Sequence, residues 1–322
     1  MASRQDYLDY LAEQGYSEDE VLRMLDPAQA DSGTSTAVGG VVGIMAGLIR
    51  DGNSKESAWA LEILQSLNAN TNYLLQNIIN GRLKKRYLEA GIEHPEDIFP
   101  GVFPTNDFNA RAVAKVPGLV LIDTACFELI EAGSWIYFSR DSIDSRNARI
   151  QSIVGDVICT RRLPPKSALD HPSLRGPESS PYKSLVTDVT TAAEEFVLAH
   201  EYAHFALGHY SQATEKSRSR LELDADRWAM ESLLQETTLL ADRRDGLITQ
   251  IAGAMMFFGL AHLVEAAQKS AGVFESSDYP AAMERFSVIR ELLRRFGLEE
   301  YCRHGEQIFA TMAHRSDSLR PQ

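Results

Sequence analysis

The spacing of apolar residues divides the chain into a mixed amino-terminal part and an almost wholly helical carboxyl-terminal part. From residue 183 to residue 314, apolar side chains recur at steps of three and four, which is typical of helices with one buried face. Pro181 precedes the first of these predicted helices, and two more are predicted over residues 221–235 and 247–264. Polar residues interrupt residues 247–264 and charges flank them, so we interpret this segment as a buried core helix rather than a membrane span.

The amino-terminal part carries fewer signals. An apolar stripe that starts at Tyr7 and stops at Gly15 predicts a short helix, and residues 56–88 predict a long one. Residues 116–123 predict a strand, because a short apolar run there is bounded by Pro117-Gly118 and Asp123, and the helical pattern of residues 124–138 follows it. A small sheet among many helices indicates an α+β, mostly helical fold.

One segment has no periodic pattern at all. Residues 161–182 hold five of the twelve prolines and predict a long surface loop. We expect two regions: a helical accessory or regulatory region over residues 1–110, and a catalytic domain over residues 111–322.

Length and charge narrow the class of function. A chain of 322 residues is long enough for one large domain or two modest ones. Its formal net charge of -13 would repel phosphate backbones, which argues against nucleic acid as a partner. Three widely spaced cysteines form neither a disulfide framework nor a CxxC metal knuckle, and the acidic amino terminus is unlike a signal peptide. We therefore expect a cytoplasmic protein without stable membrane insertion.

The sharpest chemical signal is the segment His-Glu-x-x-His at residues 200–204, inside a predicted helix. His200 and His204 lie one turn apart on the same face, so both imidazoles can bind one ion. Glu201 is rotated by about 100° from His200, where it can reach a metal-bound water. Two histidines on the metal and a carboxylate that takes the water's proton are the parts of a hydrolytic zinc site. The alternative, an exposed polar helix face, fits poorly with the apolar residues around the motif.

A second segment supplies a third ligand. Glu222 follows His204 by 18 residues, which leaves room for a turn and an antiparallel return helix. Glu222 and Asp226 lie one turn apart on a face that also carries the small residues Ala225 and Ala229. We expect Glu222 to bind the metal, and Asp226 to accept the N–H of a liganding imidazole and so fix its tautomer.

Two other histidines have less specific settings. His209 follows His204 by five residues and is rotated away from the ligand face, so we interpret it as a capping or structural residue. His262 is a polar residue late in an apolar helix, where a hydrogen-bonded core histidine competes with a backup role in stabilising an oxyanion.

Together, the pattern HExxHxxxGH followed by ExxADxxA resembles the gluzincin metallopeptidases, especially the group of the CAAX prenyl proteases and the heat-shock membrane protease HtpX. That group tends to carry His-Pro-x-x-x-x-Arg after the glutamate, and residues 279–285 have the proline and arginine in register, with tyrosine in place of histidine. The short gap between His204 and Glu222 is also similar to the soluble ImmA/IrrE-type proteases and the phage-exclusion protease Lit. The resemblance covers residues 183–295.

The resemblance implies a zincin-like core and a role for two more residues. It implies that Tyr279 points at the open side of the metal, where a phenol can donate a hydrogen bond to a developing oxyanion, and that Arg285 supports the site. In a zincin, the edge strand of the sheet precedes the metal helix, and residues 116–123 are our candidate for the edge that would hold substrate backbone.

These observations predict a zinc-dependent endopeptidase that uses one Zn²⁺ per chain, bound by His200, His204 and Glu222, with Glu201 as general base and Tyr279, or else His262, as oxyanion donor. Its partner would be a protein or peptide substrate, and a regulatory partner at the amino-terminal region is a further option. The alternative from another class is a zinc-stabilised sensor or protein-binding module without turnover.

Overall fold

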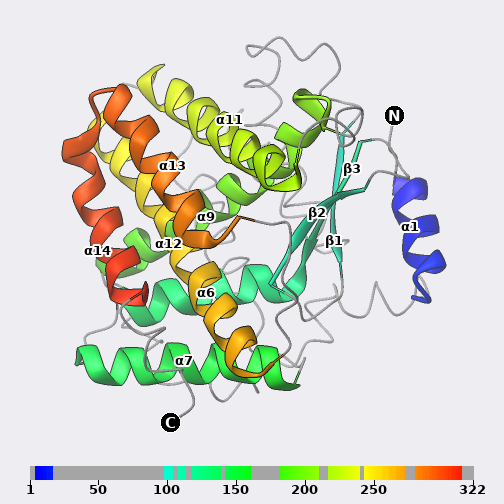
Figure 1. Cartoon of the computed structure of the whole chain (residues 1–322), viewed down its shortest axis with the longest axis horizontal. Helices are drawn as coiled ribbons and strands as arrows, with labels where there is room; N and C mark the ends of the chain where they lie inside the picture. The colour runs from blue at the N-terminus through cyan, green and yellow to red at the C-terminus, as the bar shows by residue number, and fades with distance from the viewer. Residues whose placement is uncertain are drawn as a thin grey trace, which may run out of the picture. The chain divides into compact units, whose positions relative to one another are not determined.

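The computed structural model of the chain describes residues 4–16, 98–103, 108–113, 118–138, 142–160, 181–209, 217–239, 243–272 and 280–313. The predicted helix over residues 56–88 lies outside the described residues, as does nearly all of the proline-rich segment. Most of the described residues are helical, with a small sheet, which confirms the α+β, mostly helical fold class (Figure 1).

The chain divides into two compact units. The first comprises Met1–Pro104 and Lys115–Leu119, and the second comprises Thr105–Ala114 and Val120–Gln322. In the first unit, helix α1 (Arg4–Glu13) contacts strand β1 (Phe99–Phe103). The chain leaves the helix through Gly15, whose φ of 90° suits glycine, so the predicted amino-terminal helix is confirmed.

The sheet contains two more described strands, β2 (Ala110–Val113) and β3 (Leu119–Asp123), in the hydrogen-bonded order β1-β3-β2. The strand predicted at residues 116–123 is therefore present as β3, but the prediction that it forms the sheet edge is wrong. β3 lies between the other two strands and all five of its residues are buried. Strand β2 contacts helix α9 (Pro181–Ala206), which carries the His-Glu-x-x-His segment.

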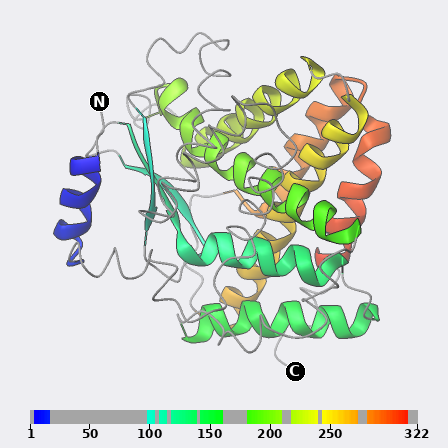
Figure 2. The ribbon, with the colours of Figure 1, turned by 180° about the vertical axis from the view of Figure 1, so that it is seen from behind.

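The second unit is built from long helices. They are α6 (Thr124–Phe138), α7 (Ile143–Thr160), α9 (Pro181–Ala206), α11 (Arg218–Leu239), α12 (Arg243–Ser270), α13 (Ala282–Arg295) and α14 (Cys302–Ala313), with the short 3-10 helix η2 (Glu299–Tyr301) before the last. Helix α9 carries the His-Glu-x-x-His segment and packs against α6, α11, α12 and strand β2. Seen from behind, α6 and α7 run side by side (Figure 2).

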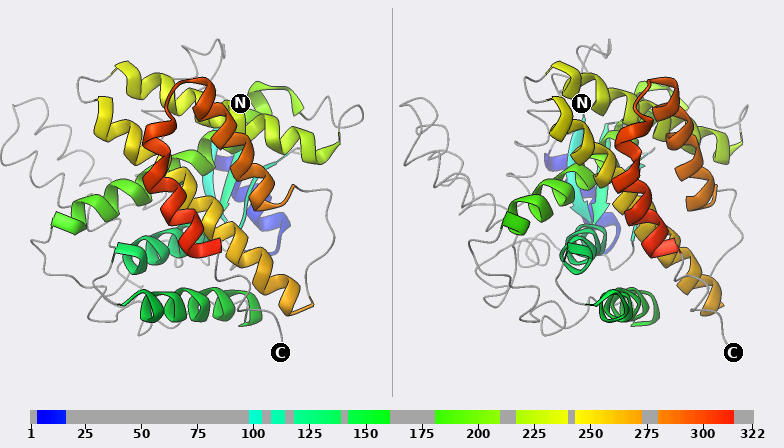
Figure 3. Two further views of the ribbon diagram at one scale, coloured as in Figure 1. Left: turned by 60° about the vertical axis from the view of Figure 1, so that its left-hand side comes forward. Right: turned by 90° about the vertical axis from the view of Figure 1, so that its left-hand side faces the viewer.

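Helix α12 forms the centre of this unit. It contacts α6, α7, α9, α11, α13 and α14, and the two views of Figure 3 show it alongside α14. Gly253 lets α12 approach α9 closely, because a Cβ at this position would lie 2.5 Å from the backbone nitrogen of Ala193. Among the described helices, α12 is also long and apolar enough to cross a membrane, but 67% of its most apolar stretch is buried inside the protein. Its packing is that of the core helix predicted from the sequence.

Candidate metal centre

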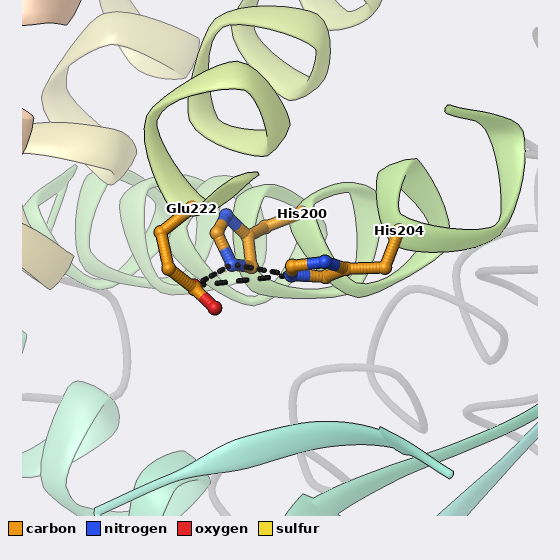
Figure 4. Close-up of side chains that lie close together, drawn as sticks. All are labelled: His200, His204 and Glu222. Carbon is orange, nitrogen blue, oxygen red and sulfur yellow. Dashed lines mark hydrogen bonds and ion pairs between the residues drawn. The ribbon is translucent and has the colours of Figure 1, made fainter. Parts of the chain in front are cut away.

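Helices α9 and α11 bring His200, His204 and Glu222 together (Figure 4). The Nε2 atom of His200 lies 3.3 Å from Nε2 of His204 and 3.1 Å from Oε2 of Glu222, and the third side of the triangle, from His204 Nε2 to Glu222 Oε2, is 3.8 Å. All three side chains are largely buried. Two histidines one turn apart on α9 and a carboxylate from the packed helix therefore offer three ligand atoms to one point.

This triangle fits a divalent ion such as zinc. Ligands at about 2.0–2.1 Å from a tetrahedral zinc lie about 3.3 Å from one another. The three measured separations fall around that value. The donor set of two imidazoles and one carboxylate is also one that zinc accepts, with a fourth position left for water.

A buried ion pair holds His200 from the side opposite the ligand triangle. Its Nδ1 lies 2.8 Å from Oδ1 of Asp226, one turn after Glu222 on α11. The guanidinium of Arg285 in turn donates to both oxygens of Asp226, at 2.7 and 2.8 Å. Asp226 is fully buried, and these charged partners stabilise its ionised form in the interior.

Two features of α12 and α13 place Arg285. The side chain of Glu265 on α12 accepts a hydrogen bond of 2.9 Å from the backbone N–H of Ala282, which fixes the amino end of α13. The guanidinium carbon of Arg285, one turn later, lies 5.6 Å and 5.3 Å from the ring centroids of Phe257 and Phe258. Rings at these distances attract a cation, so α12 supports Arg285 both through the cap and through its aromatic residues.

Without a bound ion, the two histidines carry different charges. Burial disfavours the imidazolium of His200, but the carboxylates of Asp226 and Glu222 outweigh this and raise its pKa to about 10. Burial and the charge of His200 lower the pKa of His204 to about 3. At neutral pH, His200 is therefore protonated and His204 is neutral.

Glu201 lies beside the triangle but outside it, with Oε1 4.0 Å from Nε2 of His200. Burial and the nearby Glu222 raise its pKa to about 7, although His200 and the backbone N–H of Ala112 act in the opposite direction. Ala112 belongs to β2, so this contact joins the carboxylate to the strand. A carboxyl group with a pKa near neutrality is suited to take up and release protons.

Hydrogen bonds to the end of β3 hold β2 in its position beside Glu201. Arg111, the neighbour of Ala112, donates to both oxygens of Asp123 at the end of β3, at 3.0 and 2.9 Å. The backbone N–H of Asp123 also donates to the carbonyl of Asn109 at 3.0 Å. These bonds tie the carboxyl end of β3 to β2.

Two other residues that the sequence singled out, His262 and His209, belong to the described residues. Tyr279 lies outside them, so its predicted role stays a prediction. His262 lies on α12 with its ring 6.0 Å from that of Phe309. His209, interpreted from the sequence as a structural residue, contacts His204 directly. Sequence reasoning missed this contact and the contact of Ala112 with Glu201; the Gly-His pair at the end of the motif was a signal for the first.

Comparison with known proteins adds one finding. Residues 151–305 match the family model described as Peptidase U49. The match covers just under half of the chain and includes all three residues of the triangle, so this region is similar to a family of peptidases. No curated protein and no solved structure matches the chain. The finer resemblance to the CAAX prenyl protease and HtpX group stays a prediction.

Proposed function

We propose that the protein is a zinc-dependent endopeptidase of the gluzincin type, with a zincin-like core, that acts on a protein or peptide substrate in the cytoplasm. One observation carries the proposal: inside the region that matches a peptidase family, His200, His204 and Glu222 present their ligand atoms to a single point. When bound there, zinc would lower the pKa of a water molecule and polarise the carbonyl of the scissile bond.

Residues of the chain would transfer the proton, orient the metal ligand and stabilise the oxyanion. Glu201 lies next to the ligand atoms without being one of them, and its pKa of about 7 suits a group that takes a proton from water and passes it to the leaving amine. Asp226 and Arg285 hold His200 with its Nδ1 hydrogen-bonded, which leaves Nε2 facing Glu222, where it would be free to bind zinc. Tyr279 is our candidate donor to the developing oxyanion, with His262 as the alternative.

Strand β2 is the part of the sheet suited to hold substrate. It contacts α9, it is only partly buried, and Ala112 within it already contacts Glu201. An extended peptide that pairs with β2 would add a strand to the sheet and lie next to the catalytic base. We therefore assign the binding of substrate backbone, which the sequence suggested for residues 116–123, to strand β2.

The test is Glu201→Gln, compared with the intact chain in cells, by proteomics of new protein termini. We expect the variant to keep its zinc and its fold and to lose at least about 100-fold in cleavage, because general-base catalysis contributes that much or more. Glu194→Gln is the matched control: Glu194 is a buried glutamate two turns earlier on α9, outside the triangle, and its replacement should leave cleavage intact.

Undiminished cleavage by the Glu201 variant would contradict the proposed mechanism. Stoichiometric zinc in the intact chain, with no new termini even after removal of the proline-rich segment at residues 161–182, would instead favour the zinc-stabilised sensor or binding module.

A further inference from the structure

His209 lies directly behind the second histidine of the triangle. Helix α9 ends at Ala206, and the chain then turns through Gly208, whose φ of 63° is in the region that favours glycine. The backbone N–H of Leu207 still donates to Ala203, and that of Gly208 donates to Phe205. This turn carries His209 back towards the helix, where it is only 3% exposed.

The contact between His209 and His204 is short and directional. Their Nδ1 atoms lie 2.9 Å apart, and their rings are 4.9 Å apart at 73°, which is an edge-to-face arrangement. The other ring nitrogen of His204, Nε2, is the atom that faces His200 and Glu222. His204 therefore directs one nitrogen to the candidate ion and the other to His209.

The position of protons follows from this geometry. Two nitrogens at 2.9 Å need one proton between them, because two lone pairs or two N–H groups would repel. If Nε2 of His204 gives its lone pair to an ion, the proton of that ring sits on Nδ1 and is donated to His209. Nδ1 of His209 must then be the acceptor, and its own proton sits on Nε2.

We propose that His209 is a positioning residue that fixes the tautomer and the ring orientation of His204 by accepting its Nδ1–H. The inference rests on the proposed metal site and adds a residue to it. Liganding histidines usually donate their second N–H to a carboxylate, a backbone carbonyl or water. Here a neutral imidazole takes that place, so His204 is oriented without the negative charge that Asp226 brings to His200.

Two substitutions separate an acceptor from a packed ring. Gln at position 209 keeps an oxygen that can accept from Nδ1–H, whereas Phe keeps the ring and removes the acceptor. We expect His209→Phe to bind zinc about 10- to 100-fold more weakly, the usual effect of losing such a partner, and His209→Gln to stay within about threefold of the intact chain. Zinc affinity is measured against a competing chelator, and cobalt(II) absorption reports the geometry of the site.

The outcomes are distinct. Full affinity in His209→Phe, with a loss in His209→Gln, would mean that the ring only packs and would overturn the inference. Full affinity in both would overturn it too. An intact chain that binds neither zinc nor cobalt would contradict the metal site itself.

A second measurement covers the case in which a variant fails to fold. In the zinc-loaded intact chain with ¹⁵N-labelled histidine, NMR should find the proton of His204 on Nδ1 and that of His209 on Nε2. A proton on Nδ1 of His209 would overturn the inference without any substitution.

Discussion

The two histidines of the triangle lie one turn apart on the same helix, yet the structure supports them in different ways. His200 is held by Asp226 on α11, which is held by Arg285 on α13, so its support comes from two other helices and contains two full charges. His204 is held by His209, five residues later, after the end of its own helix. One histidine depends on tertiary packing between elements and the other on a local turn of the chain.

The two histidines also differ in their basicity. Although burial acts in the opposite direction, the carboxylates of Asp226 and Glu222 raise the pKa of His200 to about 10, whereas burial and the charge of His200 lower the pKa of His204 to about 3. A strongly basic imidazole binds a cation more firmly, at the cost of a proton that must leave first. We therefore expect His200 and its ion pair to dominate metal affinity and stability.

The largest effect should follow from Asp226→Asn, which removes the charge from the His200 side alone. Arg285 would be left buried without its carboxylate, which costs about 3–5 kcal/mol in stability. Zinc affinity should fall by about 10- to 100-fold, because His200 loses the anion that orients it. Urea unfolding of the metal-free chain and competition with a chelator measure the two effects.

The control for this change is Asp224→Asn on the same helix. Asp224 pairs with Arg227 at 3.2 Å, and both side chains are partly exposed. Such a pair contributes about 0–1 kcal/mol, and Asp224 lies outside the triangle, so metal affinity should be unchanged. Equal losses in the two variants would mean that the asymmetry between the histidines has no energetic basis.

A smaller effect should follow from Arg285→Lys, which keeps the positive charge and removes the fork. Arg285 donates from two nitrogens to the two oxygens of Asp226 and lies by two phenylalanine rings. A lysine ammonium cannot reproduce this planar arrangement, so we expect a loss of about 1–3 kcal/mol in unfolding free energy. If stability is unchanged, the charge alone matters and the bidentate geometry does not.

The sequence could predict that the three candidate ligands lie together because their spacing is largely a local property of helices. His200 and His204 meet on one face through the helical repeat, and Glu222 with Asp226 repeats the same rule on the next helix. The same rule does not extend to His209, although its interpretation as a structural residue is compatible with its contact to His204. Its rotation away from the ligand face holds only on a continuing helix, but α9 ends at Ala206, and the turn at Gly208 returns the ring to His204.

The sheet shows which strands a pattern in the sequence can predict and which it cannot. The apolar run at residues 119–122 predicts a strand correctly, but an unbroken apolar run is typical of a strand buried on both faces, and β3 is indeed the middle one. Strand β2, with four residues and only Val113 buried, has no pattern that separates it from a loop. Its place beside Glu201 depends on pairing with β3 and packing on α9, which no local spacing encodes.

A change with pH, about 1.4 kcal/mol for each pH unit, tests the charge difference between the histidines directly. In the metal-free chain, the folded-state pKa of His200 is raised from 6.5 to about 10, so the stability from its ion pair is fully present below about pH 6.5 and is lost as the pH rises through about 10.

Zinc needs an unprotonated ligand, so at pH 7 we expect release of about one proton per zinc, from His200 and not from His204. Affinity should then rise by about tenfold per pH unit, or about 1.4 kcal/mol, between pH 7 and pH 9. Calorimetry in buffers of different ionisation enthalpy counts the proton, and Asp226→Asn should release less because His200 loses the charge that keeps it protonated. Zinc binding without proton release would show that the two histidines are alike before the ion arrives, and the comparison between them would then rest on geometry alone.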